Sequence, residues 1–373
     1  MAVIVVNTVP GSSRGRDARS AFFAQALPRV IEQHPDVRFV ILAAAESPVY
    51  SRFTNVLIEE SLPPGAGVIR WQWWLQVTLP ALLRKHRASV FLGCDAIGLR
   101  RVTAVQVLYV DDLQPPQAVS ALPAREAPFR GRIFRKSVLR ASSVLVPSEF
   151  CRDRLSETAG VPPGKIAVIL PGTDTRKAAE PAEREHIKTQ YAGSREYFAW
   201  RGGVDGRPAL LNVLRAFSAF KKRQKSQMRL LLIGDKGPQY EAFREKLERF
   251  RFREDVQVIT GASRETEEQI MSASYAAVIF ADASCLAESC LEAMAQSVPL
   301  ITSKTGAAPE ICGDGALYAD PGDFQSIALQ MLLLFKDEAR RRVLIDQGLR
   351  RSGQFRWDDC AARLWQHIQP GIC

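Results

Sequence analysis

The chain has 373 residues, of which 46% are hydrophobic and 24% charged, and its formal net charge is +10. This length suits two domains of ordinary size, each able to bury a core. The composition excludes disordered and fibrous classes, and the lack of a long apolar run excludes a membrane span.

Apolar strands alternate with helical periods through the first half of the chain. We expect strands at 2–7, 37–44, 89–93, 104–113 and 142–150. We expect helices at 21–33, 72–86 and 125–140. Continuous apolar strands separated by helices predict a parallel sheet covered on both faces. The start is broken early by Pro10 and Gly11, so it indicates a first core strand rather than a secretory signal.

A turn-rich segment at 160–175 predicts a connection between domains, after which the pattern restarts. We expect strands at 197–203, 229–235, 255–261, 276–282 and 298–303. We expect helices at 209–223 and 239–250. The fold class is therefore α/β with two units in tandem, each presenting ligand sites at the carboxyl ends of its strands.

Cysteine and histidine spacing gives no sign of a metal site or a catalytic histidine. The seven cysteines include no Cys-x-x-Cys pair, and the four histidines are scattered. We expect free thiols in a reducing cytoplasm, no metal and no cofactor.

Basic residues cluster at 125–140, 221–225 and 340–342. In the first cluster, Arg130, Arg135 and Lys136 stand among Phe and Ile residues and predict an amphipathic basic helix. Such a helix lies against an anionic membrane surface or an acidic protein partner, but a solvated helix face explains the pattern equally well. Nucleic acid fits worse, because no binding motif accompanies the charge.

Five stretches, in family order, resemble the group 1, or family 4, glycosyltransferases. They are "WQWWLQVTLPALLRKHRASVFLG", "VLYVDDL", "VLVPSEFCRDRLSETAGVPPGKIAVILPGTD", "YFAWRGGVDGRPALLNVLRAF" and "ASCLAESCLEAMAQSVPLITSKTGAAPEICGDGALYADPGD". The resemblance implies the GT-B fold, with two Rossmann-like lobes facing each other across a cleft. It implies an acceptor lobe at 1–172, a donor lobe at 173–354, and a C-terminal helix at 355–373 that returns to the first lobe.

The resemblance also implies a sugar transfer from a nucleotide-sugar donor, with retention of configuration. Glu292 stands where the family has a carboxylate that binds ribose hydroxyls. Its other reading is a capping box, because Ser289 and Glu292 have the Ser-x-x-Glu spacing. Arg207 matches the family's phosphate-binding Arg, and its other reading is an exposed turn residue.

Several positions depart from the family pattern and weaken the donor site. Pro208 follows Arg207 where the family has Lys, and proline brings neither charge nor an N–H donor. Ser284 replaces the first Glu, and the stretch after it lacks the glycines that let the backbone approach a diphosphate. Ser297 replaces a further Gly. Val110 replaces a His and is followed by Asp111, which we assign to orienting an acceptor or sugar hydroxyl unless it is only a turn residue.

Other residues could compensate for these losses. Arg201 places a cation before Gly202 and Gly203, which remain available for close phosphate approach. Glu288 could share a helical face with Glu292, although a solvent-facing charge is the simpler reading. The remaining members of the expected donor site lie in its lower loop: Thr305, Gly306 and Glu310.

Three functions remain open on the sequence. The first is an active, retaining glycosyltransferase of glycan or cell-envelope assembly, cytoplasmic or peripheral at the inner face of the membrane, that binds a nucleotide sugar or nucleoside diphosphate. The second is an inactive relative that acts as a binding or scaffolding subunit. The third is an enzyme acting on another phosphorylated ligand. Loss of two charge-stabilising groups would slow chemistry by on the order of 10⁴-fold without compensation.

Overall fold

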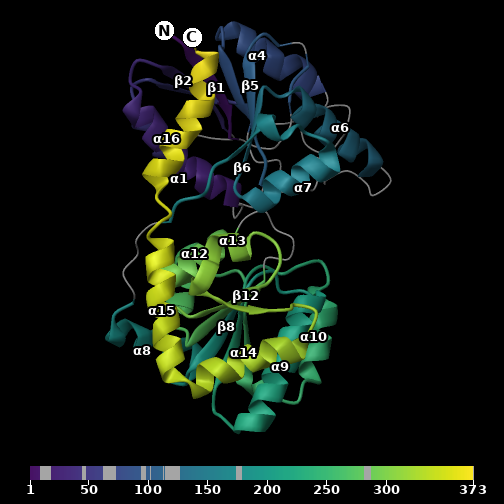
Figure 1. Ribbon diagram of the computed structural model, residues 1–373, viewed down its shortest axis with the longest axis vertical. Coiled ribbons are helices and arrows are strands. Elements are labelled where there is room, and N and C mark those ends of the chain that lie inside the picture. Colours follow the sequence, from purple (N-terminus) through teal and green to yellow (C-terminus); the bar gives the residue numbers. More distant parts are fainter. Residues whose placement is uncertain are drawn as a thin grey trace. The chain divides into compact units, whose positions relative to one another are not determined.

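The computed structural model describes residues 1–8, 18–43, 48–61, 73–93, 98–100, 102–111, 113, 127–173, 179–280 and 287–372. The chain divides into two compact units (Figure 1). Unit 1 comprises Met1–Gly172 and Arg356–Cys373, and unit 2 comprises Thr173–Phe355.

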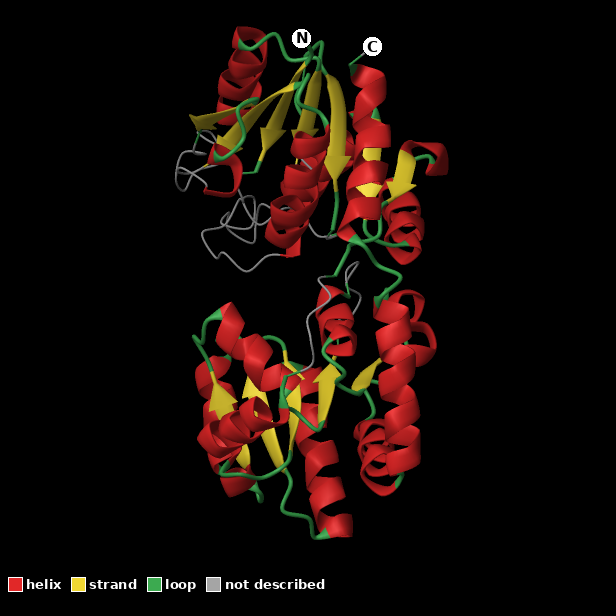
Figure 2. Ribbon diagram, turned by 90° about the vertical axis from the view of Figure 1, so that its left-hand side faces the viewer, coloured by secondary structure: helices red, strands yellow, loops and turns green. Residues whose placement is uncertain are grey.

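Unit 1 is built on a parallel sheet with the strand order β3-β2-β1-β4-β5-β6-β7. The strands are β1 (Val3–Asn7), β2 (Arg38–Ala43), β3 (Val56–Glu60), β4 (Val90–Gly93), β5 (Val105–Tyr109), β6 (Ser143–Val146) and β7 (Ile166–Val168). The order reverses at β1, which pairs with β2 on one side and β4 on the other. The central strands are almost wholly buried because helices cover both faces of the sheet (Figure 2).

The helices of unit 1 come from both ends of the chain. They are α1 (Ala18–Gln33), α2 (Pro48–Ser51), the turn η1 (Trp74–Thr78), α4 (Leu79–Lys85), α6 (Ala127–Arg140), α7 (Glu149–Ala159), η3 (Pro163–Lys165), α16 (Trp357–Ile368) and η6 (Gln369–Gly371). The C-terminal helix α16 packs on α1, where the rings of His34 and Trp365 stack at 3.5 Å. Arg29 Nε also donates to Asp358 Oδ1 at 3.2 Å across this pair of helices.

Unit 2 repeats the plan with a parallel sheet in the order β10-β9-β8-β11-β12-β13. The strands are β8 (Tyr197–Arg201), β9 (Arg229–Ile233), β10 (Val256–Ile259), β11 (Ala276–Ile279), β12 (Leu300–Ser303) and β13 (Leu317–Ala319). The chain runs outward from β8 to β10 and then returns to β11 on the other side of β8. The point between β8 and β11 is therefore a topological switch point, where ligands of such sheets bind.

The helices of unit 2 lie on both faces of its sheet (Figure 2). They are α8 (Pro181–Ala192), α9 (Pro208–Gln224), α10 (Tyr240–Glu248), η4 (Arg253–Asp255), α11 (Arg264–Ser272), α12 (Glu288–Ala295), α13 (Ala308–Cys312), η5 (Gly313–Gly315), α14 (Phe324–Lys336) and α15 (Glu338–Ser352). Helix α9 shows the pattern well, because its stripe Leu210, Val213, Phe217 and Phe220 is buried in the core.

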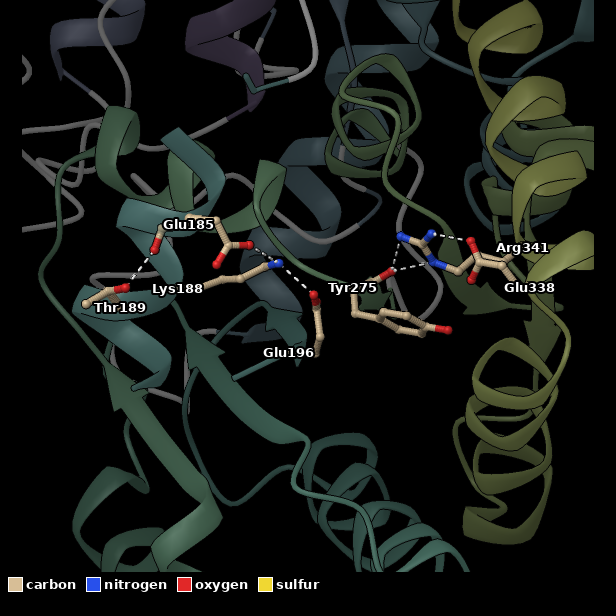
Figure 3. Close-up of polar contacts among 7 residues, drawn as sticks. All are labelled: Glu185, Lys188, Thr189, Glu196, Tyr275, Glu338 and Arg341. Carbon is tan, nitrogen blue, oxygen red and sulfur yellow. Dashed lines mark hydrogen bonds and ion pairs between the residues drawn. The ribbon is translucent and has the colours of Figure 1, made fainter. Parts of the chain in front are cut away.

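Two cations fasten outer helices of unit 2 to the sheet (Figure 3). Lys188 on α8 donates to Glu196 at 2.6 Å and to Glu185 at 2.9 Å. Burial alone would lower the pKa of Lys188, but these two bonds outweigh it and raise the pKa. The guanidinium of Arg341 on α15 lies 4.5 Å from the centre of the Tyr275 ring and donates to the Tyr275 carbonyl at 3.4 Å.

The structure corrects three expectations about elements. Segment 160–175 is not only a connection, since it contains β7 at the edge of the first sheet. The expected strand at 142–150 ends at Val146, and α7 begins at Glu149 with Ser148 accepting from Cys151 N at 3.1 Å. Strand β3 was not expected, because its half-exposed edge position breaks the apolar run.

In the part of the chain that the structure describes, no helix has both the length and the apolar character needed to span a membrane.

Candidate functional site

The candidate site lies at the carboxyl edge of the second sheet, around the switch point between β8 and β11. Arg201 ends β8, and Gly202 and Gly203 follow it. Helix α12 begins shortly after β11 and carries Glu288 and Glu292. Because all strands of the sheet are parallel, the loops after β8, β9, β10 and β12 meet at this same edge.

Glycines let the backbones after β8 and β9 cross at close range. Gly202 N donates to Ile233 O at 3.0 Å. Gly234 has φ of +148°, and a Cβ there would lie 2.1 Å from the carbonyl oxygen of Gly202. No side chain fits at that distance, so the crossing requires glycine at position 234.

Glu292 is the best-supported carboxylate of the site. One of its oxygens accepts from Arg201 Nη1, and the other accepts from Arg264 Nη2 at 2.5 Å. The side chains of Arg201 and Glu292 are 14% and 16% exposed, so this pair is largely shielded from water. The two guanidiniums fix the direction of the carboxylate.

Arg264 extends this ion pair into a cluster that the sequence did not reveal. It is the first residue of α11, and its Nε donates to Glu268 at 2.8 Å. Its Nη2 also lies 3.9 Å from Glu288. Position 264 follows β10, the edge strand of the sheet, and lies 28 residues from Glu292, so sequence spacing could not predict this contact.

Two alternative readings of α12 are wrong. The capping box fails because the helix begins at Glu288, with Ala287 as N-cap and no side-chain cap. Ser289 therefore lies inside the first turn, and Glu292 bonds to two arginines instead. Glu288 is not a solvent-facing charge either, since its side chain is 14% exposed and faces Arg264 as Glu292 does.

Arg207 lies in the turn before α9 and forms a forked pair with Asp205. Its Nε and Nη2 donate to the two carboxylate oxygens at 2.7 and 2.9 Å. These bonds lower the pKa of Asp205, and they outweigh the opposite effect of burial. The Arg207 side chain is 47% exposed, which leaves it accessible to a ligand. Pro208 is the first residue of α9 and offers no N–H at the helix start.

Lys236 is a further cation that sequence reasoning missed. It is exposed on the loop after β9, and its Nζ lies 4.6 Å from the centre of the Tyr240 ring. This loop pairs with the turn that carries Arg207, because Val204 N donates to Asp235 O at 2.9 Å and Gly237 N donates to Val204 O at 3.1 Å. The sequence could have singled out Lys236 because it directly follows the strand expected at 229–235.

The lower loop of the expected donor site follows β12 and enters α13. Thr305 shares a hydrogen bond of 2.9 Å with Ser303, and Gly306 has a left-handed φ of +79°. Glu310 lies in the first turn of α13. Its carbonyl accepts from Arg351 Nη2 at 2.7 Å, which ties α13 to α15. These contacts shape the loop but do not assign a ligand to it.

The remaining expected residues are Asp111 and Ser284. Asp111 belongs to unit 1, two residues after β5, at the carboxyl edge of the first sheet. Val110 before it is 1% exposed and offers no polar group where the family has His. Ser284 lies outside the described residues.

Thiols and carboxylates give no sign of a resident metal. Within the described ranges, no group of three or more Cys, His, Asp or Glu side chains is arranged to hold a metal ion. The described free thiols are all buried: Cys151, Cys290, Cys312 and Cys360. A hydrogen bond to Cys290 and burial both raise the pKa of Cys312, so this thiol is protonated and unreactive.

Solved structures with the same arrangement define the fold. Anabaena HepE, determined in complex with UDP and glucose, has a TM-score of 0.75 at 14% identity, with 99% of this chain and 100% of HepE covered. WaaG, a glycosyltransferase involved in lipopolysaccharide biosynthesis, has a TM-score of 0.74 at 13% identity, covering 98% and 99% of the two chains. The fold is therefore the α/β GT-B fold of these glycosyltransferases.

Sequence comparison then gives the family. The model described as Glycosyl transferases group 1 matches residues 202–351, and that of Glycosyltransferase Family 4 matches residues 23–177. The Escherichia coli O-antigen chain mannosyltransferase B is 22% identical over 243 residues, which is 65% of this chain. That match spans 64% of the relative's own length. The chain belongs to the group 1 / family 4 glycosyltransferases.

Proposed function

We propose that this protein transfers a sugar from a nucleoside diphosphate sugar, with retention of configuration, in the assembly of a glycan of the cell envelope. The observation that carries the proposal is the carboxylate of Glu292, fixed by Arg201 and Arg264 beside the glycine crossing at the switch point. A ribose diol can donate to this carboxylate while the diphosphate lies over the glycines. The names of the relatives support a sugar nucleotide as the donor class.

The cations of the turn supply the charge that the reaction needs. The bond between the sugar C1 and the diphosphate oxygen breaks, and the acceptor oxygen forms the new bond to C1. The acceptor proton passes to the departing phosphate, whose charge is stabilised by Arg207, Lys236 and the N–H group of Gly203. Lys236 takes over the role of the lysine that Pro208 replaces. Asp111 orients the acceptor hydroxyl in unit 1.

Donor cleavage tests this assignment. We expect release of a nucleoside diphosphate from at least one donor in a panel that includes UDP-glucose and GDP-mannose. Lys236→Ala and Arg207→Gln should each lower kcat by on the order of 10²-fold, whereas Lys304→Ala, beside Thr305, should leave it within about twofold. Proton NMR of the product should show the anomer of the donor. Release that is unaffected by both variants, or an inverted product, would refute the proposal.

A non-catalytic role is the second candidate, and one observation favours it. Both oxygens of Glu292 are already engaged by guanidiniums, so a ribose must compete with two ion pairs. A scaffolding subunit would bind a nucleoside diphosphate without turnover on any acceptor. Binding that Glu292→Ala abolishes, with no donor cleavage in the wild-type protein, would select this role over catalysis.

We also assign the basic face of α6 to a peripheral contact with an anionic membrane surface. Phe134 and Val138 are buried in the unit, whereas Arg132 and Lys136 are exposed. Arg135 also supports the fold, since its Nε donates to Ala159 O at 3.0 Å, and the side chain of Arg130 lies outside the described residues. Arg132→Glu with Lys136→Glu should abolish co-sedimentation with anionic liposomes. Unchanged co-sedimentation would mean that α6 serves another partner.

A further inference from the structure

A pocket of about 870 Å³ opens on unit 1. Its lining includes Gln76, Arg84, Leu99, Arg100, Gln106 and Arg140. A volume of this size is typical of sites that bind small molecules.

The pocket lies at the amino edge of the first sheet. Gln106 is the second residue of β5, and Arg140 ends α6 three residues before β6 begins. Arg84 is in the last turn of α4, which leads into β4. Asp111 follows the opposite, carboxyl end of β5. The pocket is thus separate from the edge where the sheet presents its acceptor-binding candidate.

Three arginines face the pocket. None of the lining residues that the structure describes is acidic. Among the residues that the structure describes, Arg84, Arg100 and Arg140 have no ion pair, and all three are exposed. Three cations around one cavity repel each other, and an anion bound between them would relieve that repulsion.

The dipoles of helices explain only part of this arrangement. Arg84 and Arg140 lie in last turns, where a cation is favourable for that reason alone. Arg100 is not on a helix, but its segment is held firmly. The Gln106 amide accepts from Leu99 N at 2.7 Å and donates to Leu99 O at 3.1 Å. A Cβ at Gly98 would lie 3.2 Å from the same amide, so the segment packs closely on β5.

Two exposed apolar side chains lie on the same helical segment as part of the lining. Trp73 and Val77 are 62% and 41% exposed. They are one turn apart on the helix that supplies Gln76 and Arg84 to the lining. The guanidinium of arginine binds phosphate oxygens through two parallel N–H groups. The exposed indole of Trp73 either faces water or lies at the boundary of a lipid layer.

We propose that this pocket is a second ligand site, which binds a phosphate-bearing group through Arg84, Arg100 and Arg140. Its ligand is a phosphate ester, either soluble or in the headgroup of a phospholipid. The site does not depend on the proposed transferase activity, because none of its residues lies at the donor edge.

Calorimetric titration with inorganic pyrophosphate tests the site. All proteins in this titration should carry Arg207→Gln, because this change weakens diphosphate binding at the glycine turn. Arg100→Gln and Arg140→Gln should each weaken the remaining binding by about tenfold. Arg154→Gln is the matched control, since it removes the same charge from the exposed face of α7 in the same unit, and it should leave the affinity within about twofold. Unchanged melting temperatures exclude misfolding.

A second arm identifies the source of the phosphate. Vesicles of phosphatidylglycerol that displace pyrophosphate, and that lose this effect in Trp73→Gln, indicate a lipid headgroup. Pyrophosphate binding that vesicles leave unchanged indicates a soluble phosphate ester. Both outcomes support the site. Two outcomes overturn it: no binding of pyrophosphate at millimolar concentration, or equal losses in Arg140→Gln and Arg154→Gln.

Discussion

Two groups of three arginines give this chain very different surfaces. Arg201, Arg207 and Arg264 at the donor edge are each paired with a carboxylate of the protein. The arginines of the pocket in unit 1 have no such partner in the described residues. A ligand at the donor edge must compete with internal ion pairs, whereas a ligand in the pocket supplies the missing charge. Carboxylates of the protein neutralise and orient the first group, whereas the positive charge of the second group is left for a bound anion to neutralise.

The largest effect should come from breaking the central pair of the donor edge. Glu292→Ala leaves Arg201 and Arg264 facing each other, and we expect it to lower the free energy of unfolding by about 2 kcal/mol. Glu157→Ala, which removes an exposed pair with Arg154, should cost at most about 0.5 kcal/mol. Urea denaturation compares the two variants. Equal losses would show that the donor-edge pairs are no stronger than ordinary surface pairs.

A gain in stability should follow from relieving strain at the end of α12. Ser297 adopts a left-handed φ of +62°, which is unfavourable for a residue with a Cβ. Ser297→Gly should therefore raise the free energy of unfolding by about 1 kcal/mol, measured by thermal or urea denaturation. A neutral or destabilising effect would mean that the serine side chain compensates for the backbone.

The pH dependence of stability should distinguish Arg207 from the arginines of the pocket. Hydrogen bonds from Arg207 hold the pKa of Asp205 below its ordinary value of 3.8. The pair therefore stabilises the folded protein above that pH, and its contribution is lost as the pH falls through the pKa of Asp205 in the folded state. Arg207→Gln should raise the pKa of Asp205, as carbon-13 NMR can show. The difference in stability from wild type should be full near pH 7 and shrink below about pH 4. A difference independent of pH would contradict the pairing.

The smallest effects should be found in the pocket of unit 1. Arg84→Gln, Arg100→Gln and Arg140→Gln remove no ion pair, so each should change the free energy of unfolding by less than about 0.5 kcal/mol. Relief of their mutual repulsion could even stabilise the protein slightly. A loss as large as that of Glu292→Ala would show that these arginines serve the fold rather than a ligand.

The sequence predicted the parallel α/β architecture because buried parallel strands are nearly continuous apolar runs, as in β1, β9 and β11. It missed β3, whose exposed positions interrupt that run, and it misread the segment that contains β7. Glu292 and Arg207 were singled out by their resemblance to family positions.

Arg264 and Lys236 could not be found in that way. Arg264 lies 28 residues from Glu292 in the chain, and it begins α11, the helix that connects the edge strand β10 to β11. Lys236 follows a strand that was expected, but no local pattern links it to the turn of Arg207. Contacts between loops of different strands are set by the topology of the sheet, so spacing within one segment does not predict them.

Titration of nucleoside diphosphates by calorimetry tests the central claim most directly. We expect UDP, GDP or another nucleoside diphosphate to bind the wild-type protein, with Glu292→Ala weakening that affinity by at least about tenfold and Glu157→Ala leaving it unchanged. Melting temperatures measured alongside ensure that both variants are folded. Absence of binding at millimolar concentration for every nucleotide, or an affinity that Glu292→Ala does not alter, would contradict the donor site proposed for this edge of the sheet.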